Sequence, residues 1–162
     1  MAKEIKRKFL VTKNPWTTTT GYVDIMQGYL NNDGRVIVRV RWQTMLNGPS
    51  KHQGFITIKG NHSGITRDEY EYEIPGSEAA KLLNTLANSM LVKRRWYIPH
   101  AGHIWHVDQF GSTNTGLVIA EIELSAEQEI CLLQPGWCGD DVSNNEQYSS
   151  YNLSINPYQY WQ

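Results

Sequence analysis

Alternation of polar and hydrophobic residues runs through most of the chain and predicts a protein built mainly of β-strands. Residues 4–10 read EIKRKFL, in which Glu4, Lys6 and Lys8 fall on every second position. Because successive side chains of a strand point to opposite faces of a sheet, these three charges share one face. Comparable extended patterns predict eight strands in all, over residues 4–11, 27–30, 35–42, 55–60, 65–75, 91–99, 103–110 and 116–124.

The connections between these segments favour antiparallel pairing. Asp33-Gly34, within NNDGR, is a hairpin signal because both residues tolerate positive φ angles. The links that follow the sixth and seventh strands are short enough for hairpins. Residues 14–26 are expected to form a loop with a short helical turn, and the Gly/Pro-containing residues 47–54 a second loop.

The clearest helical pattern follows the fifth strand. Ser77, directly after Pro75-Gly76, suits an N-cap, and an apolar stripe at helical spacing comprises Ala79, Leu82, Leu83, Leu86 and Met90. We expect this stripe to pack on the outer face of the sheet. Residues 125–129 predict a helical turn capped by Ser125, and the C-terminal residues a loop with a short helix. The predicted fold class is α+β, with antiparallel strands dominant.

Composition and charge narrow the classes of function. The chain has 162 residues, 40% of them hydrophobic and 19% charged, which fits one globular domain over residues 1–162. The net charge of −1 gives no overall attraction to a nucleic acid polymer or an anionic membrane, so charge-based recognition must be local. No apolar run could span a membrane, the N-terminus lacks the apolar segment of a secretory signal, and two cysteines are too few for a disulfide framework. These features predict a cytoplasmic protein.

The charged residues of the predicted strands are sorted by sign. Some strand faces carry mainly bases and others mainly acids, although neighbouring surface charges ordinarily mix. The basic positions are Lys8, Arg39, Arg41, Lys59, Arg67, Lys93 and Arg95, with Lys6 beside them. The acidic positions are Glu4, Glu69, Glu71, Asp108, Glu121 and Glu123.

Two interpretations of these charged faces are open. The plainer one takes them as the solvated outer faces of an antiparallel sheet. The other faces of the same strands are apolar, however, and the helix could cover them from outside. Rows of one sign then suggest an extended anion for the bases and a divalent cation for the acids, inside a barrel that eight strands can close. Such a lumen requires water, counter-carboxylates or a polyanion, because an unpaired buried charge is costly.

Eight segments occur in an order typical of a known family: EIKRKFLV, RVRW, TIKG, RDEYEYEIP, KRRWYI, IWHVDQF, GLVIAEIEL and QYSSYNLSINPY. In this combination they resemble the CYTH family, the triphosphate tunnel metalloenzymes, and most closely its short prokaryotic members. The resemblance implies a closed eight-stranded antiparallel β-barrel with helices packed outside. It also implies a tunnel that binds a triphosphate-bearing ligand through bases, with Mg²⁺ or Mn²⁺ held by glutamates. Activities in the family include hydrolysis of tripolyphosphate or thiamine triphosphate and, in one branch, adenylate cyclisation.

Carried over by position, the resemblance assigns roles to the charged residues. Phosphate contacts would come from Lys8, Arg39, Arg41, Lys59, Arg67, Lys93 and Arg95, since guanidinium and ammonium groups suit phosphate oxygens. Glu4, Glu121 and Glu123 would hold metal, with Glu69, Glu71 and Asp108 as further inward acids. The catalytic group would be Glu4, Lys8, Glu121 and Glu123, around a metal-oriented water that attacks the terminal phosphorus.

The chain departs from the family at its N-terminal signature. The family pattern is ExExK, and here Lys6 stands where the second glutamate belongs, a change of two charge units at the metal site. The remaining carboxylates could still hold one ion. In the C-terminal segment, Ser143 and Gln147 stand where the family commonly has a threonine and an arginine.

Three hypotheses about function follow. The first is a metal-dependent triphosphatase acting on inorganic tripolyphosphate or a similar small triphosphate. The second is a tunnel that binds a nucleotide or polyphosphate without turnover, with Lys6 as the inactivating change. The third, ranked lowest, is an adenylate cyclase. A homodimer is the default expectation for the assembly.

Two other features of the sequence were weighed. His100, His103 and His106 are three residues apart, but strand alternation puts His103 on the face opposite to His106 and Asp108, so no zinc site is predicted. Tyr158, Tyr160 and Trp161 are expected to pack over one end of the barrel.

Overall fold

A computed structural model describes residues 3–16, 19–129 and 134–161. These residues form nine strands, two α-helices and three short 3-10 helices. The strands are β1 Lys3–Val11, β2 Gly21–Asn32, β3 Ile37–Met45, β4 Gly48–Lys59, β5 Thr66–Ile74, β6 Ser89–His100, β7 His103–Phe110, β8 Val118–Glu123 and β9 Cys138–Asp141. The helices are α1 Gly76–Leu86, α2 Ser150–Ile155, η2 Ser112–Asn114, η3 Glu146–Tyr148 and η4 Tyr158–Tyr160. None of these helices has the length and hydropathy needed to cross a membrane.

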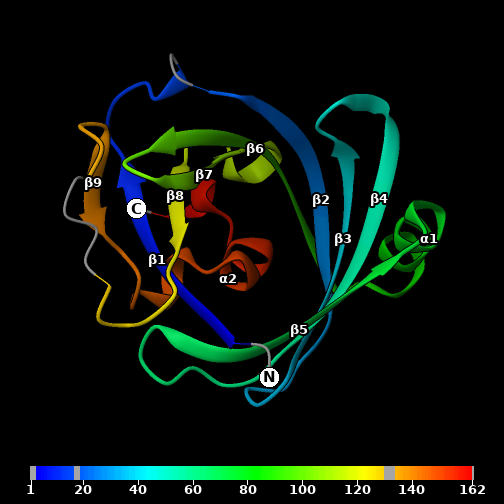
Figure 1. Ribbon diagram of the computed structural model, residues 1–162. Helices are drawn as coiled ribbons and strands as arrows, with labels where there is room; N and C mark the ends of the chain where they lie inside the picture. Colours follow the sequence, from blue (N-terminus) through cyan, green and yellow to red (C-terminus); the bar gives the residue numbers. More distant parts are fainter. Residues whose placement is uncertain (1–2, 17–18, 130–133, 162) are drawn as a thin grey trace.

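Eight of the strands close into an antiparallel barrel, which confirms the predicted fold (Figure 1). The order is β5-β4-β3-β2-β6-β7-β8-β1, and the ring closes where β1 pairs with β5 at Lys3↔Asp68, Glu4↔Arg67 and Ile5↔Thr66. The next part of β1 is paired by β9, with Phe9 opposite Asp141 and Val11 opposite Cys138. The prediction missed β9.

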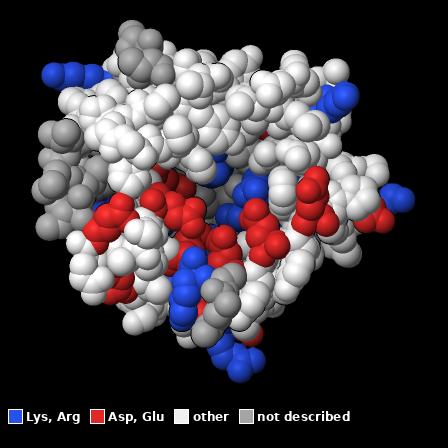
Figure 2. Space-filling model, in the orientation of Figure 1, with Lys and Arg blue, Asp and Glu red and all other residues white. Residues whose placement is uncertain are grey.

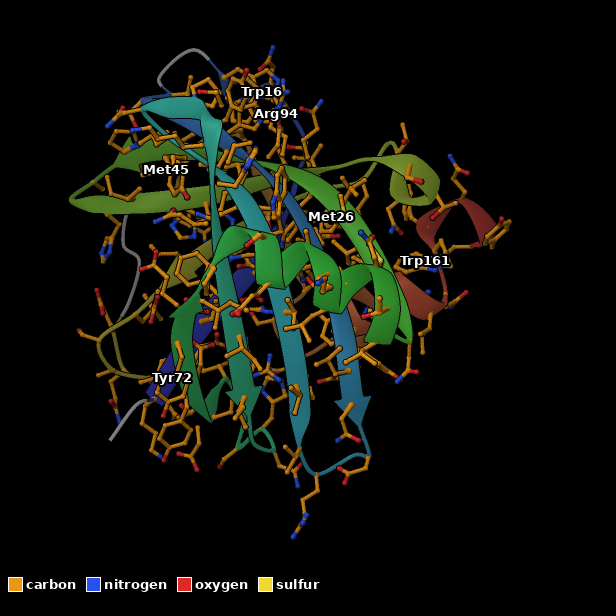
Figure 3. The ribbon with its side chains drawn as sticks, turned by 90° about the vertical axis from the view of Figure 1, so that its right-hand side faces the viewer. Trp16, Met26, Met45, Tyr72, Arg94 and Trp161 are labelled. Atoms are coloured by element: carbon orange, nitrogen blue, oxygen red, sulfur yellow. The ribbon has the colours of Figure 1, made fainter. Side chains whose placement is uncertain are left out.

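The outer wall of the barrel is apolar and is covered by α1. Ala79 and Leu83 of α1 are buried against Val40 of β3, and Figure 3 shows the helix lying across β2, β3 and β4. A β-carbon on Gly54 of β4 would lie 2.7 Å from the β-carbon of Ala79, so glycine is required for this close approach. The predicted packing of the helix outside the sheet is confirmed.

A second apolar cluster closes one end of the barrel. Leu153 of α2 is fully buried against Leu91, Phe110, Leu117 and Ile119. Seen down the barrel, α2 lies across the ring rather than along its wall (Figure 1). The aromatic tail behaves as expected in part, because Tyr158 and Trp161 pack on this cluster while Tyr160 is 70% exposed.

Several predicted boundaries were wrong. β2 begins at Gly21, so residues 21–26 belong to a strand and not to the predicted loop with a helical turn. β4 begins at Gly48, within the second predicted loop. The ladder with β6 extends β2 back to Gly21, and the ladder with β3 extends β4 back to Gly48, which outweighs the local glycine and polar composition.

The predicted helix ends and caps also need correction. α1 starts at Gly76 after Pro75, whose side chain makes no cap, so Ser77 is not the N-cap. Leu86 is 59% exposed and Met90 belongs to β6, so neither is part of the packed stripe. Residues 125–129 form a turn rather than a helix, in which the Ser125 N–H and hydroxyl both donate to the Glu129 carboxylate.

Candidate active site

The charged strand faces point into the lumen of the barrel. A cavity of about 370 Å³ occupies it and is lined by all the predicted site residues except Asp108, which lies directly behind the lining. Figure 2 shows this hollow from one mouth, with acidic side chains around it and basic side chains deeper inside. Of the two interpretations of these faces, the solvated outer surface is therefore excluded.

The strand register explains why the charges can share one cavity. Rows of one sign lie beside rows of the other, so that Lys8 is opposite Glu121, Lys6 opposite Glu123 and Lys59 opposite Glu69. Opposite charges directly across a ladder stabilise it, whereas like charges would repel. The sequence suggested that the basic and acidic strand faces bind two separate ligands, an anion and a cation. The register shows that the two kinds of face also neutralise each other's charge inside the barrel.

Glu4 is the centre of one ion-pair cluster. Its side-chain oxygens lie 2.8 Å from Lys59 Nζ, 3.2 Å from Arg67 Nε and 3.2 Å from Lys6 Nζ. Burial alone would raise the pKa of Glu4, but Lys6 and Lys59 hold it well below its usual range. Burial, with repulsion from Arg39, lowers the pKa of Lys59 to about 7. Glu4 is therefore ionised at neutral pH, whereas Lys59 is only partly protonated there, and an added phosphate would favour its charged form.

Glu121 is the centre of the second cluster. Its Oε2 lies 3.3 Å from Lys6 Nζ and 3.5 Å from Arg95, and its Oε1 lies 3.8 Å from Lys8 Nζ. Among the described residues, Oε2 is buried without a hydrogen-bond donor at hydrogen-bonding geometry. Burial acts to raise the pKa of Glu121, and the surrounding lysines and Arg95 lower it well below its usual value. Oε2 of this ionised carboxylate is therefore held by ion-pair contacts rather than by a hydrogen bond.

Asp108 anchors two bases from beneath the side chains that line the cavity. It is 1% exposed and accepts from Arg95 Nε at 2.7 Å and from Arg95 NH2 at 2.9 Å, while Lys93 Nζ lies 2.8 Å away. Burial lowers the pKa of Lys93 to about 8 although Asp108 raises it, and Asp108 lifts the pKa of Arg95 above its usual value. The predicted acid thus sets the position of two predicted phosphate-binding bases.

Arg39 and Arg41 form the least neutralised part of the wall. They share one carboxylate, Glu71, at 3.4 and 3.3 Å, and Arg39 also donates to Thr57. Within the described part of the chain, the Nε–H groups of both arginines are buried without an acceptor. Burial, with repulsion from Arg39, lowers the pKa of Arg41 to about 10. These two guanidinium groups are therefore candidates for binding an anion.

The histidines do not form a metal site. The described residues contain no group of three or more His, Cys, Asp or Glu side chains arranged to hold an ion. Burial and Arg95 lower the pKa of His106 to about 4, so it is neutral. His103, expected to point away, instead lies at the cavity rim, where it is 3.2 Å from Glu129.

The carboxylates nevertheless suit a divalent ion that arrives with its ligand. Glu121 Oε2 makes ion-pair contacts but no hydrogen bond among the described residues, and Glu123, two residues along β8, is exposed at the cavity rim. Mg²⁺ is commonly bound by one or two carboxylates together with phosphate oxygens rather than by a cage of protein ligands alone. Glu121 and Glu123 fit this way of binding a metal ion together with phosphate. An ion held by Glu4, Glu121 and Glu123 together does not fit, because Lys6 lies among these carboxylates.

Strand β2 and the C-terminal segment add residues to the site that were not among the predicted site residues. Tyr29 and Tyr151 line the closed end of the cavity and meet edge to face at 5.2 Å. Ser143 also lines it and accepts from the backbone N–H of Lys8 at 2.9 Å, whereas Gln147 is not among the lining residues. Short polar loops carry no periodicity, so only the tertiary structure could reveal them.

Comparisons with known proteins agree with this geometry. A family model described as CYTH domain matches residues 2–132. An inorganic triphosphatase of Acetivibrio thermocellus is 39% identical over 159 residues, with 98% of this chain and 97% of the relative covered. An inorganic triphosphatase of Nitrosomonas europaea is 28% identical, with 94% and 97% covered.

Solved structures share the fold. One of an inorganic triphosphatase superposes with a TM-score of 0.66 at 26% identity and covers 96% of each chain. A protein from Pyrococcus horikoshii OT3 superposes with a TM-score of 0.54 at 18% identity, over 76% of this chain and 79% of its own, and shows the fold alone.

Proposed function

Because the chain belongs to the CYTH family, we propose that it is a hydrolase that cleaves inorganic tripolyphosphate, or a similar small triphosphate, inside the barrel. The proposal draws on relatives that are inorganic triphosphatases and on the charge of the cavity. The eight predicted bases, Lys6 included, face six predicted acids in and behind the cavity wall. An extended anion is the ligand that this excess of bases fits.

The two unpaired guanidinium donors carry the proposal. Buried N–H groups without an acceptor are costly, and charged ones more so. Arg39 and Arg41 occupy successive inward positions of β3 and line the cavity, so phosphate oxygens could accept from both guanidinium groups once these turn toward the ligand. Filling these positions would give ligand binding its specificity for phosphate over a single carboxylate.

Inorganic triphosphate is favoured over a nucleotide by the relatives, which are inorganic triphosphatases, and the tyrosines of the lining add no support for a nucleotide. A base needs a stacking surface or a set of hydrogen-bonding groups at its edge. Among the described lining residues the tyrosines are Tyr29 and Tyr151, which pack on each other at the closed end. That end is sealed by Leu153 and its apolar neighbours, so a ligand would enter from the other end. Neither a nucleotide-binding tunnel without turnover nor an adenylate cyclase gains support from this geometry.

Hydrolysis of such a ligand would depend mainly on positioning and charge neutralisation. Arg39, Arg41 and Arg95 would hold phosphate oxygens, with Arg95 fixed in place by Asp108. Glu121 and Glu123 would hold a Mg²⁺ or Mn²⁺ ion, which would neutralise charge on the triphosphate. Glu121 is ionised at neutral pH and can accept a hydrogen bond that orients the attacking water.

A double substitution tests the proposal. Arg39→Ala with Arg41→Ala should weaken tripolyphosphate binding by about two to four powers of ten, because charge-assisted hydrogen bonds contribute roughly 1.5–3 kcal/mol each. Phosphate release in the presence of Mg²⁺ or Mn²⁺ should fall with it. The matched control is Arg94→Ala, on the outer face of β6, where Arg94 pairs with Asp24.

Titration calorimetry and a phosphate-release assay give the two readouts, and thermal unfolding checks that each variant is folded. The proposal fails if the unmodified protein releases no phosphate with either metal. It also fails if the double variant binds and hydrolyses tripolyphosphate as well as the Arg94→Ala control does.

A further inference from the structure

The ammonium group of Lys6 lies between the carboxylates best suited to hold a cation. Lys6 Nζ is 3.2 Å from Glu4 Oε2 and 3.3 Å from Glu121 Oε2, and Lys6 pairs with Glu123 across the β1–β8 ladder. Its side chain is 21% exposed and lines the cavity, so it is neither a surface lysine nor sealed away from a ligand. A single positive group thus bridges acids from two strands.

The position is one that a divalent ion would otherwise take. Two buried carboxylates a few ångströms apart require a cation between them, because their mutual repulsion is weakly screened inside the barrel. Other bases contact only one of these two acids: Lys59 and Arg67 contact Glu4, whereas Lys8 and Arg95 contact Glu121. Lys6 is the base that contacts both Glu4 and Glu121 among the described ion pairs.

An ammonium group can neutralise these acids and still reach a ligand. It has three N–H donors, and the two contacts with Glu4 and Glu121 leave one for another acceptor. Because Lys6 lines the cavity, that acceptor can be a phosphate oxygen. A covalently attached cation needs no binding equilibrium, unlike a metal ion.

We propose that Lys6 is the resident cation of this active site: it takes the place of a divalent ion between Glu4 and Glu121 and contacts the triphosphate directly. The inference rests on the proposed function for its ligand. Its consequence is specific, since this protein should bind tripolyphosphate without any divalent metal. Metal would enter only with the ligand, at Glu121 and Glu123.

Binding of tripolyphosphate in EDTA is the first measurement. The unmodified protein should bind under these conditions by calorimetry. Lys6→Met, which keeps the length of the side chain and removes its charge, should weaken this binding about 10- to 100-fold, as the loss of one charge-assisted contact would. Arg7→Met is the matched control: Arg7 is the next residue of β1, points outward to Asp141 and should leave the affinity unchanged.

Binding of Mn²⁺ without tripolyphosphate is the second measurement, by electron paramagnetic resonance of the free ion. The unmodified protein should take up no Mn²⁺ at micromolar concentrations. Lys6→Glu should create a Mn²⁺ site, because it adds a carboxylate where the ammonium was, and its tripolyphosphate binding should become dependent on Mn²⁺. If Lys6→Met fails to fold, two other variants still test the inference. Lys6→Arg keeps a covalently attached cation at this position, whereas Lys6→Glu replaces it with a bound Mn²⁺ ion.

The outcomes separate this inference from the proposed function. Binding of tripolyphosphate in EDTA without hydrolysis in any metal would overturn the proposed function and leave the role of Lys6 intact. Hydrolysis together with binding that requires Mn²⁺, or Mn²⁺ uptake by the unmodified protein alone, would overturn the role of Lys6 and leave the function intact. Unchanged affinity of Lys6→Met in EDTA would show that Lys6 is only a structural counterion, which also overturns the inference.

Discussion

Replacement of Asp108 by asparagine measures how weakly charges are screened inside the barrel. Asp108 is 1% exposed and contacts Arg95 at 2.7 and 2.9 Å and Lys93 at 2.8 Å. Asparagine has nearly the same size and keeps one acceptor oxygen, so the substitution removes the negative charge with little change in packing. Two buried cations are then left without their shared counterion.

The expected loss of stability is large. Breaking a buried ion pair by removing one partner costs about 3–5 kcal/mol, and in a chain of this size each kcal/mol lowers Tm by roughly 2–4 °C. Asp108→Asn should therefore lower Tm by about 6–20 °C. Lys93 can limit the loss by releasing its proton, since burial already lowers its pKa to about 8. The loss should accordingly be smaller at pH 8.5 than at pH 6.

The outer surface of β6, the strand that carries Lys93 and Arg95, supplies the control. Arg94 is bound by Asp24 through two hydrogen bonds of 2.8 and 3.2 Å, a geometry like that of Arg95 with Asp108. The Asp24 and Arg94 side chains are 46% and 40% exposed, however, and exposed pairs contribute only about 0–1 kcal/mol. Asp24→Asn should therefore change Tm by no more than about 4 °C.

Unfolding followed by tryptophan fluorescence, with and without added salt, gives both values. Salt should abolish the small effect of Asp24→Asn and leave that of Asp108→Asn, because buried pairs are screened less. Equal losses in the two variants would mean that the lumen is as well solvated as the outer surface. The account of buried, ion-paired side chains around the cavity would then be wrong.

Three further results are expected. Lys93 is charged below its pKa of about 8 and neutral above it, so tripolyphosphate affinity should fall from pH 7 to 9 more in the unmodified protein than in Lys93→Met; calorimetry on both proteins cancels the titration of the ligand, and parallel profiles would contradict this. Leu153→Ala should cost about 2–5 kcal/mol in denaturant unfolding, because Leu153 is fully buried at the closed end; a loss below 1 kcal/mol would mean that α2 is not a packed seal. Gly54→Ala should cost about 1–3 kcal/mol through its clash with Ala79, and an unchanged Tm would count against the close approach of α1 to β4.

The barrel was predictable because its strands carry opposite chemistry on their two faces. Charges on every second residue predicted the inward side of β1, β3 and β6, and the apolar positions between them predicted the outer wall. The short strand β9 was not predictable. Its CGDD sequence has no strand pattern, and it forms because the part of β1 beyond β5 still has an open edge to pair.

The members of the site were more predictable than their partners. Alternation identifies which face a charge occupies, but it contains no information on register between strands far apart in the sequence. That Lys8 lies opposite Glu121, or that Asp108 anchors Arg95, depends on the order of strands around the barrel. For the same reason the departure at Lys6 was visible in the sequence, whereas its contacts with Glu4 and Glu121 required the structure.

The pairing inside the cavity also restricts where a triphosphate can bind first. Most bases already contact a carboxylate, and a phosphate oxygen would have to compete with it for the same donors. The Nε–H groups of Arg39 and Arg41 have no such competitor within the described chain, whereas Glu121 Oε2 already lies against Lys6 and Arg95. A phosphate group can therefore approach β3 without breaking an ion pair, whereas a metal ion alone would have to displace Lys6 from Glu121. A triphosphate should thus bind first, and a metal ion should enter with it at Glu121 and Glu123 instead of preceding it.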